Sequence, residues 1–301
     1  MNGFGSRLKG RYGVALGYLT VVLIWGTTWY GVHNQVNGTA PHVAVALRLG
    51  AASLIFFAIA RALGLSLRID RRQIGLILVQ GALWCGVNFI AVYTASQYLT
   101  SGVVAVLFSI NVPFNIVAER LMNGTKPRLS VTLAALTGIV GIALVFSGEL
   151  ETAFRVRSAV WGAALAVFAA ASVAVGNVVA TRVAATDFGG IRQNAYCLGV
   201  GTLTILLWGA LSGAPWTLHV TPVWLLSYAY LVLVGTVVAF TIYIGILPVV
   251  GSVAAAYIVV ISPVVAIGLS VLLEGLRLGP ITLAGVALLL VGQSILAMQK
   301  R

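Results

Sequence analysis

Ten apolar stretches, each long enough to cross a bilayer, follow one another along the chain with short polar joints between them. A membrane-spanning helix needs roughly 20 mostly apolar residues, at a rise of about 1.5 Å each. The stretches comprise residues 14–32, 43–60, 74–95, 102–118, 131–147, 159–180, 195–211, 223–247, 252–273 and 278–298. Because they leave no sizeable water-soluble part, the sequence predicts an all-α integral membrane protein with ten transmembrane helices.

The net charge of +12 is concentrated in alternate joints. One set of joints and ends carries Arg7, Lys9, Arg11, Arg61, Arg68, Arg71, Arg72, Arg120, Lys126, Arg128, Arg182, Lys300 and Arg301. The opposite set carries Arg155, Arg157 and Arg277. Because basic residues concentrate in cytoplasmic loops, we predict a multi-pass protein of the cell membrane with both termini in the cytoplasm. This topology accounts for the high pI without a nucleic-acid partner, and leaves the lipid bilayer as the expected surroundings.

The chain is similar to itself when it is shifted by 150 residues. At this offset Gly26 falls on Gly176, Tyr93 on Tyr243, Val103 on Val253, Ala105 on Ala255 and Pro113 on Pro263. The same shift superposes the apolar stretches five on five. An odd number of spans per copy turns the second copy over in the membrane, and inverted repeats are typical of transporters with a substrate site near the midplane. We therefore predict two inverted five-helix repeats, residues 1–150 and 151–301.

Three segments carry a resemblance to a known family. They are LIWGTTWYGV at 23–32, ALRLGAASL at 46–54 after Pro41, and ISPVVAIGLSVLLEGLRLGPITLAGVALLLVGQSIL at 261–296. The last has Pro263 and Glu274 eleven residues apart, followed by Gly285 and Gly292. Together they resemble the EamA family of the drug/metabolite transporter superfamily.

This resemblance implies a ten-helix carrier of two five-helix repeats that moves small metabolites, often outward. Within the superfamily, the chain resembles the aromatic amino acid exporters in length and aromatic content. The first half departs from the pattern, because Gly124 stands where the second half has Glu274. A family role for that acid therefore cannot be carried over to the first half.

Polar residues recur at helical spacing inside two of the expected spans. The third span carries Gln80, Trp84 and Asn88 four residues apart, and the fourth carries Asn111 and Asn115 at the same spacing. Residues so spaced lie on one helical face, and polar side chains in a bilayer usually face the bundle interior or a wet cavity. One interpretation is a solvated cavity between these helices. The other is hydrogen bonding between helices, each bond stabilising by about 0.6–2 kcal/mol.

Arg48 and three aromatic residues are further candidates for a substrate site. Arg48 is the one basic residue well inside a span of the first half, and a guanidinium suits carboxylate or phosphate. A structural role that fixes the second helix is equally compatible with its position. Trp25, Tyr243 and Tyr257 lie well inside their spans, where they either stack on a ring-bearing substrate or belong to the packed core.

Pro113 and Pro263 fall mid-span at matching positions of the two halves. Proline removes a helical hydrogen bond and bends a helix, so the pair forms either hinges or static bends. The two cysteines, Cys85 and Cys197, show no disulfide or metal spacing. We predict neither a metal nor a cofactor.

These features favour a transporter that exports small metabolites, above all neutral or aromatic amino acids, by alternating access at a central cavity between the repeats. At the offset of 150, Asn88, Asn111 and Asn115 correspond to Val238, Ile261 and Val265. A cavity with one polar and one apolar side suits an amino acid. A sugar-phosphate or nucleotide-sugar carrier of the same superfamily is the alternative. One chain with two repeats can enclose its own pathway, so a monomer is sufficient.

Two other classes are disfavoured. An integral-membrane enzyme would need a catalytic cluster, but the chain has no HExxH motif and all three histidines lie near span ends. A signalling or scaffold protein would need a larger loop or tail. Since all six acidic residues map near span ends or in joints, obligate proton-coupled export of cations is also disfavoured.

Overall fold

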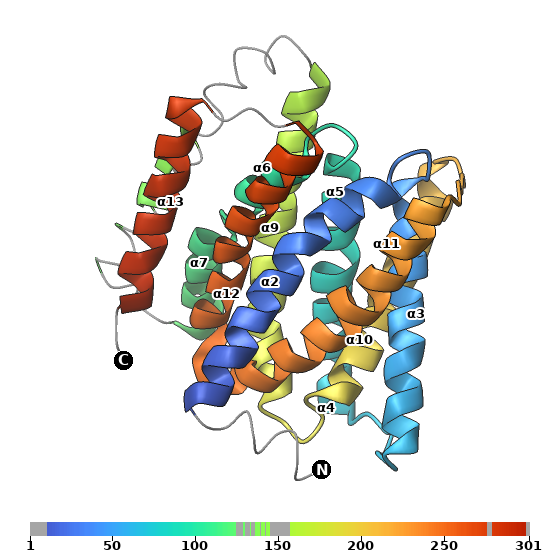
Figure 1. Ribbon diagram of the computed structural model, residues 1–301. Helices are drawn as coiled ribbons and strands as arrows, with labels where there is room; N and C mark the ends of the chain where they lie inside the picture. The colour runs from blue at the N-terminus through green and yellow to red at the C-terminus, as the bar shows by residue number, and fades with distance from the viewer. Residues whose placement is uncertain are drawn as a thin grey trace.

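The computed structural model describes residues 11–124, scattered positions between 129 and 144, and residues 157–275 and 279–298. Within these residues the secondary structure is entirely helical (Figure 1). The helices are α2 (Arg11–Gln35), α3 (Pro41–Ala62), α4 (Arg71–Gln80), η1 (Gly81–Val87), α5 (Asn88–Ala95), α6 (Ser101–Phe108), α7 (Asn111–Asn123), α9 (Arg157–Ala184), α10 (Ile191–Ser212), α11 (Pro222–Val232), η2 (Leu233–Val238), α12 (Ala239–Leu273) and α13 (Pro280–Met298).

Seven helical runs have the length and hydropathy of a membrane span. They are Tyr12–Gln35, Pro41–Ala62, Arg71–Ala95, Ser101–Asn123, Ser158–Ala184, Ile191–Ser212 and Pro222–Leu247. Two shorter apolar helices, Ile261–Leu273 and Pro280–Gly292, fall in the ninth and tenth stretches expected from the sequence. The fifth stretch, residues 131–147, lies largely outside the described residues. The structure therefore confirms an all-helical membrane protein over its described part and accounts for seven full spans.

Proline and glycine set several of the helix ends. Pro41 and Pro222 are the first residues of α3 and α11, a position where the missing N–H is not needed. The hydroxyl of Thr221 caps α11 by accepting a hydrogen bond from the N–H of Trp224 at 3.1 Å. Gly124 and Gly213 follow α7 and α10 with φ of +70° and +66°, the left-handed backbone that ends helices at little cost for glycine.

The third span contains a π-helix, and so does the eighth. The helix from Arg71 to Ala95 passes through η1, and the helix that begins at α11 passes through η2 into α12. Moved by 150 residues, η1 would cover 231–237, which overlaps η2 at 233–238. In both π-helices, glycines permit close packing. A Cβ on Gly81 would lie 2.6 Å from that of Val200, and one on Gly235 would lie 2.7 Å from Cγ2 of Thr28.

The fourth span is interrupted before Pro113. Helix α6 ends at Phe108 and α7 begins at Asn111. Between them, the N–H groups of Ser109 and Ile110 bond to carbonyls three residues back, at 3.0 and 3.2 Å. A proline ring collides with the carbonyl four residues before it, here that of Ser109. Pro263 interrupts nothing, because α12 is helical from end to end.

Helix α12 nevertheless reverses direction. Tyr243 lies against Trp25, with ring centroids 4.9 Å apart, and Val265 lies against Gly26. The two α12 residues are 265 − 243 = 22 positions apart, which would be about 33 Å in a straight helix, while Trp25 and Gly26 are neighbours. The chain must therefore turn back between them, as the ribbon does at the lower left of Figure 1. The joint expected at 248–251 lies within this turn.

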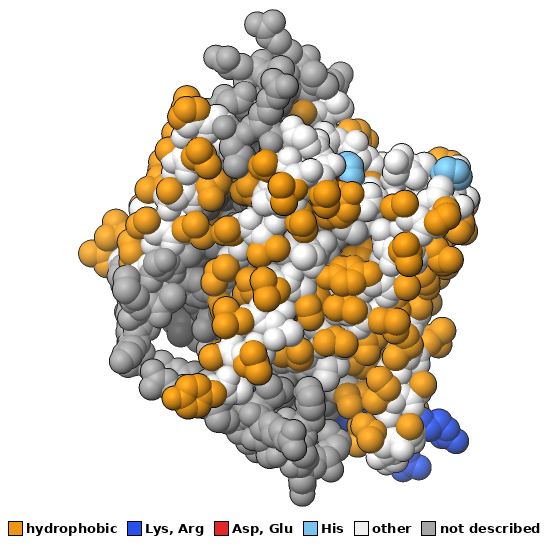
Figure 2. All heavy atoms as spheres, in the orientation of Figure 1, with side chains coloured by type: hydrophobic (Ala, Val, Ile, Leu, Met, Phe, Trp, Pro, Cys, Tyr) orange, Lys and Arg blue, Asp and Glu red, His pale blue; other side chains and the backbone are white. Residues whose placement is uncertain are grey.

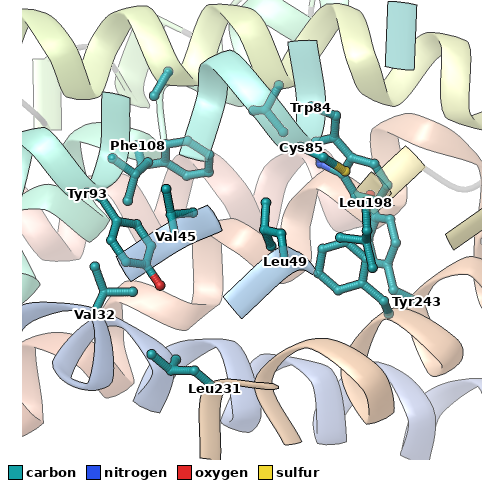
Figure 3. Close-up of a cluster of buried hydrophobic side chains, with 14 of the residues drawn as sticks. Val32, Val45, Leu49, Trp84, Cys85, Tyr93, Phe108, Leu198, Leu231 and Tyr243 are labelled. Atoms are coloured by element: carbon teal, nitrogen blue, oxygen red, sulfur yellow. The ribbon is translucent and has the colours of Figure 1, made fainter. Parts of the chain in front are cut away.

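Helix α2 packs against α11 and α12, α3 packs along α10, and α9 packs against η1, α5, α6 and α7. Between these packed helices lies a continuous apolar core (Figure 3). The core includes Val45, Leu49, Leu198 and Leu231.

Hydrophobic side chains are spread over the described part of the face shown in Figure 2. Leu16, Leu19 and Leu23 of α2 are each more than half exposed, as lipid-facing residues are. Arginines are exposed in the joint between α3 and α4, at Arg61, Arg68, Arg71 and Arg72.

Candidate functional site

A cavity lies inside the helix bundle, where seven elements meet. Its walls are Trp25, Thr28, Trp29 and Val32 of α2, Arg48 of α3, Trp84 of η1, Asn88, Phe89, Val92 and Tyr93 of α5, Phe108 of α6, Val173 of α9, and Phe240 and Ser262 of α12. The described residues of this wall are mostly aromatic and aliphatic, and one of them is charged. Such a composition is typical of sites for small organic molecules.

Arg48 is the charged member of this wall and is only 3% exposed. Its Nε donates to the hydroxyl of Thr236 at 3.0 Å, and its Nη1 donates to the hydroxyl of Tyr93 at 3.2 Å. The guanidinium also lies over the ring of Phe89, 5.3 Å from its centroid. The partners of Arg48 among the described residues are thus two hydroxyls and an aromatic ring, all of them neutral. A buried cation with neutral partners suits an anionic ligand.

The partners of Arg48 are themselves held in place. Thr236 lies in η2, and its hydroxyl donates to the carbonyl of Leu231 at 2.8 Å, five residues back, which is the repeat of a π-helix. The hydroxyl of Tyr93 donates to Oε1 of Gln35 at 3.2 Å. The backbone carbonyl of Gln35 accepts from the indole of Trp224 at 3.2 Å. Arg48 is thus tied to α2, α5 and α11 through hydroxyl and amide groups.

Three aromatic rings, those of Trp25, Trp84 and Phe240, form one end of the cavity, and a fourth packs behind them. Trp84 stacks on Phe240 with centroids 5.2 Å apart and planes at 25°, and it also contacts Tyr243 at 5.7 Å. Trp25 meets Tyr243 at 4.9 Å and Phe240 at 5.8 Å. Tyr243 stands behind the wall, almost fully buried, and its hydroxyl donates to Oδ1 of Asn177 at 3.3 Å. Trp84 and Tyr243 appear together at the right of Figure 3.

Gln80 and Asn88, which were predicted to share one polar face of the third span, have different surroundings in the structure. Asn88 lines the cavity; its Nδ2 donates to the carbonyl of Trp84 at 3.0 Å, while its Oδ1 is buried without a partner. Gln80 lies outside the cavity wall and accepts from Nε2 of Gln193 at 3.0 Å, a bond between two helices.

Asn111 and Asn115 are also fully buried away from this cavity wall. Nδ2 of Asn115 donates to the carbonyl of Asn111 at 2.9 Å. Oδ1 of Asn115 and both amide atoms of Asn111 have no partner in the described part of the chain. That these two amides line a pathway stays a prediction. Tyr257 lies in α12, and its side chain is outside the described residues.

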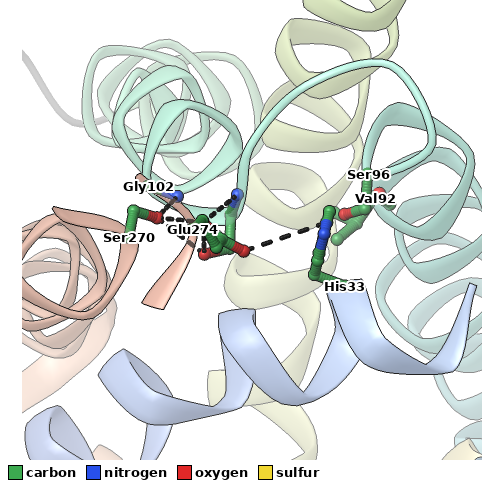
Figure 4. Close-up of polar contacts among 7 residues, drawn as sticks. His33, Val92, Ser96, Gly102, Ser270 and Glu274 are labelled. Atoms are coloured by element: carbon green, nitrogen blue, oxygen red, sulfur yellow. Dashed lines mark hydrogen bonds and ion pairs between the residues drawn. The ribbon is translucent and has the colours of Figure 1, made fainter. Parts of the chain in front are cut away.

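A polar cluster joins α6, α2 and the C-terminal end of α12 (Figure 4). Oε2 of Glu274 accepts from the N–H of Ser101 at 3.3 Å, from its hydroxyl at 2.8 Å, and from the hydroxyl of Ser270. Ser270 in turn accepts from the N–H of Gly102 at 2.8 Å. The carboxylate therefore sits at the N-terminus of α6, where a negative charge is stabilised. Nδ1 of His33 is 3.9 Å from Oε1 of Glu274, one helical turn from Trp29 of the cavity wall.

Sequence reasoning found Trp25, Arg48, Trp84 and Asn88 of the wall. It missed the partners of Arg48, Tyr93 and Thr236, which no helical spacing connects to it. It also missed Phe89, although its neighbour Asn88 was recognised. Among the described residues no cluster of three metal-ligating side chains occurs.

Comparison with known proteins agrees with this picture. The model of the EamA-like transporter family matches residues 12–147 and again 160–298. Because these two matches cover most of the chain, the protein belongs to the EamA family.

Curated relatives point the same way. The chain is 25% identical to the "uncharacterized transporter YoaV" of Bacillus subtilis over 227 residues, 74% of this chain and 76% of that protein. It is 24% identical to the "uncharacterized inner membrane transporter YedA" of Escherichia coli K12 over 275 residues, 91% and 86% of the two chains. A crystal structure with 18% identity superposes with a TM-score of 0.70, over 96% of this chain and 98% of the other. The family match and these relatives indicate a membrane transporter of small molecules.

Proposed function

We propose that the protein exports neutral amino acids, with large apolar or aromatic side chains preferred, through the central cavity. The observation that carries this proposal is Arg48, a buried cation with neutral partners in an otherwise aromatic and aliphatic cavity. A guanidinium binds a carboxylate through paired hydrogen bonds. The rings of Trp25, Trp84 and Phe240 offer faces on which an apolar or aromatic side chain stacks.

We further propose that residues 1–150 and 151–301 are inverted repeats that alternate in opening the cavity to either side. Three features support this. The family model matches once in each half. The two π-helices overlap at an offset of 150. Helix α2, the first of one half, packs on α12 of the other, while α9, the first of the second half, packs on α6 and α7 of the first. Such reciprocal packing is expected of repeats that share one central site.

The break between α6 and α7 supports a hinge at Pro113, since freed backbone groups permit bending there. The equivalent role of Pro263 rests on the repeat relationship alone. Because one chain supplies the whole cavity wall, a monomer in the cell membrane is sufficient for transport.

The test is counterflow of labelled phenylalanine in liposomes that contain only this protein. We expect unlabelled phenylalanine trapped inside to drive uptake of the label, and tryptophan and methionine to compete. Specificity should be broad, because shape and stacking distinguish side chains by only about 1–3 kcal/mol per methylene-sized difference. Empty liposomes are the control.

Uptake of a sugar phosphate or nucleotide sugar, with no competition by amino acids, would overturn the amino acid assignment. It would instead favour the alternative carrier class, with Arg48 as the phosphate ligand.

A further inference from the structure

The charge on the cavity wall is unbalanced. Of the described residues that line the cavity, Arg48 is positively charged and none is acidic. Its hydrogen-bonded partners Thr236 and Tyr93 are neutral hydroxyls. A ligand with one negative charge makes the cavity neutral, whereas a zwitterion adds a positive charge for each negative one. In a low-dielectric interior this difference weighs more than it would in water.

An α-ammonium group would find little to compensate its charge. Because it is one carbon away from the carboxylate, pairing the carboxylate with Arg48 brings the ammonium close to the guanidinium, and like charges repel. On the wall, Oδ1 of Asn88 is the amide oxygen without a partner. One neutral acceptor, with the ring faces of Trp25 and Trp84, is a weaker counterpart than a carboxylate.

From this balance we propose that the cavity recognises its ligand by carboxylate and apolar body, so that aromatic monocarboxylates without an amino group bind more tightly than the corresponding amino acids. The inference rests on the proposed function, because it takes the central cavity as the substrate site. It goes beyond that function by naming amine-free aromatic monocarboxylates as a substrate class.

The experiment measures binding of labelled 3-phenylpropionate to the purified full-length protein. Binding is preferable to flux, because the neutral acid form crosses bilayers unaided. The competitors are phenylalanine, which adds the amine, and 3-phenylpropanamide, which keeps the shape but loses the charge. We expect each to need at least about tenfold higher concentration than unlabelled 3-phenylpropionate, a factor that corresponds to about 1.4 kcal/mol.

Three variants test whether the preference for 3-phenylpropionate arises from Arg48 and Asn88 of the cavity wall. Arg48→Gln should abolish the preference for 3-phenylpropionate over its amide, while Arg48→Lys should keep the preference with weaker binding, since it retains the charge but loses the planar fork. Asn88→Leu should weaken competition by phenylalanine several-fold more than it weakens binding of 3-phenylpropionate. Gel filtration checks that each variant is folded; if Arg48→Gln is not, the Arg48→Lys and Asn88→Leu results decide.

Tighter binding of phenylalanine than of 3-phenylpropionate would overturn the inference, as would equal binding of the acid and its amide. Failure here is distinct from failure of the proposed function. Phenylalanine counterflow without 3-phenylpropionate binding would leave amino acid export intact and refute the carboxylate class. Binding in the predicted order without phenylalanine counterflow would support the carboxylate class and refute amino acid export.

Discussion

The role inferred for Arg48 depends on partners that lie far from it in the sequence. Its position inside an apolar span marks it as a candidate, but Tyr93 lies 45 residues away and Thr236 lies 188 residues away. Both supply hydroxyls rather than carboxylates, and this choice of partners leaves the charge available. A carboxylate at either position would have turned the same arginine into half of an internal ion pair.

Tyr243 offers a direct test of the aromatic end. Changing it to Ala removes a ring that supports Trp25 and Trp84. We expect competition by phenylalanine and tryptophan to weaken several-fold more than competition by methionine, because an aromatic pair contributes about 0.5–1.5 kcal/mol beyond its buried area. The measurement is competition against labelled phenylalanine in liposomes. Tyr243→Phe is the matched control, since it keeps the ring and loses only the bond to Asn177; equal losses for all three amino acids would argue against stacking.

Gly26 is a position where a single methyl group should disturb the packing. A Cβ there would lie 2.5 Å from Cβ of Val265 and 3.0 Å from the carbonyl oxygen of Ser262. We expect Gly26→Ala to lower the free energy of unfolding by about 1–3 kcal/mol, the usual effect of overpacking. Thermal unfolding in detergent measures it. Gly268→Ala is the control, because nothing lies within 4 Å of that position; an equal effect at both sites would show that the contact between α2 and α12 is not tight.

At the scale of elements, the apolar stretches predicted most helices but not their irregularities. The apolar stretches correspond to the described helices because chain length in a bilayer fixes both. The break before Pro113 could be predicted from the proline, whereas the continuous helix through Pro263 could not. The π-helices could not be predicted from the sequence, because one extra residue in a turn barely changes a continuous apolar stretch. The amides show the same limit of the sequence. Their spacing placed Gln80 and Asn88 on one helical face, but it could not show that Gln80 bonds to Gln193 while Asn88 lines the cavity.

Glu274 joins two elements, and its removal should separate them. Glu274→Ala deletes the acceptor for the N–H and hydroxyl of Ser101 and for the hydroxyl of Ser270. Since hydrogen bonds to a charged group contribute about 1.5–3 kcal/mol each, we expect a loss of stability of at least about 2 kcal/mol, measured by thermal unfolding in detergent. Ser101→Ala, which keeps the backbone contact, should cost less. If Glu274→Ala were as stable as the unchanged protein, the carboxylate would not be the link between α6 and α12.

At the scale of the whole molecule, the topology remains a prediction from charge. The exposed arginines between α3 and α4 lie at one end of their helices, as expected if that end faces the cytoplasm. We expect reporters that fluoresce only in the cytoplasm to be active at both termini, and reporters that require export to be inactive there. Opposite results at the two ends would exclude an even number of spans and with it the ten-helix count.

The two π-helices carry a consequence for the history of the chain. A π-turn holds one residue more than the α-turn it replaces, so a single inserted codon within an α-helix suffices to create one. Helices η1 and η2 overlap when the halves are superposed at the offset of 150. Under the duplication that we propose, one insertion in the ancestral five-helix unit accounts for both. That ancestor would have acted as a pair of identical chains inserted in opposite orientations, and it would already have carried the irregular turn from which Trp84 and Thr236 now reach the site.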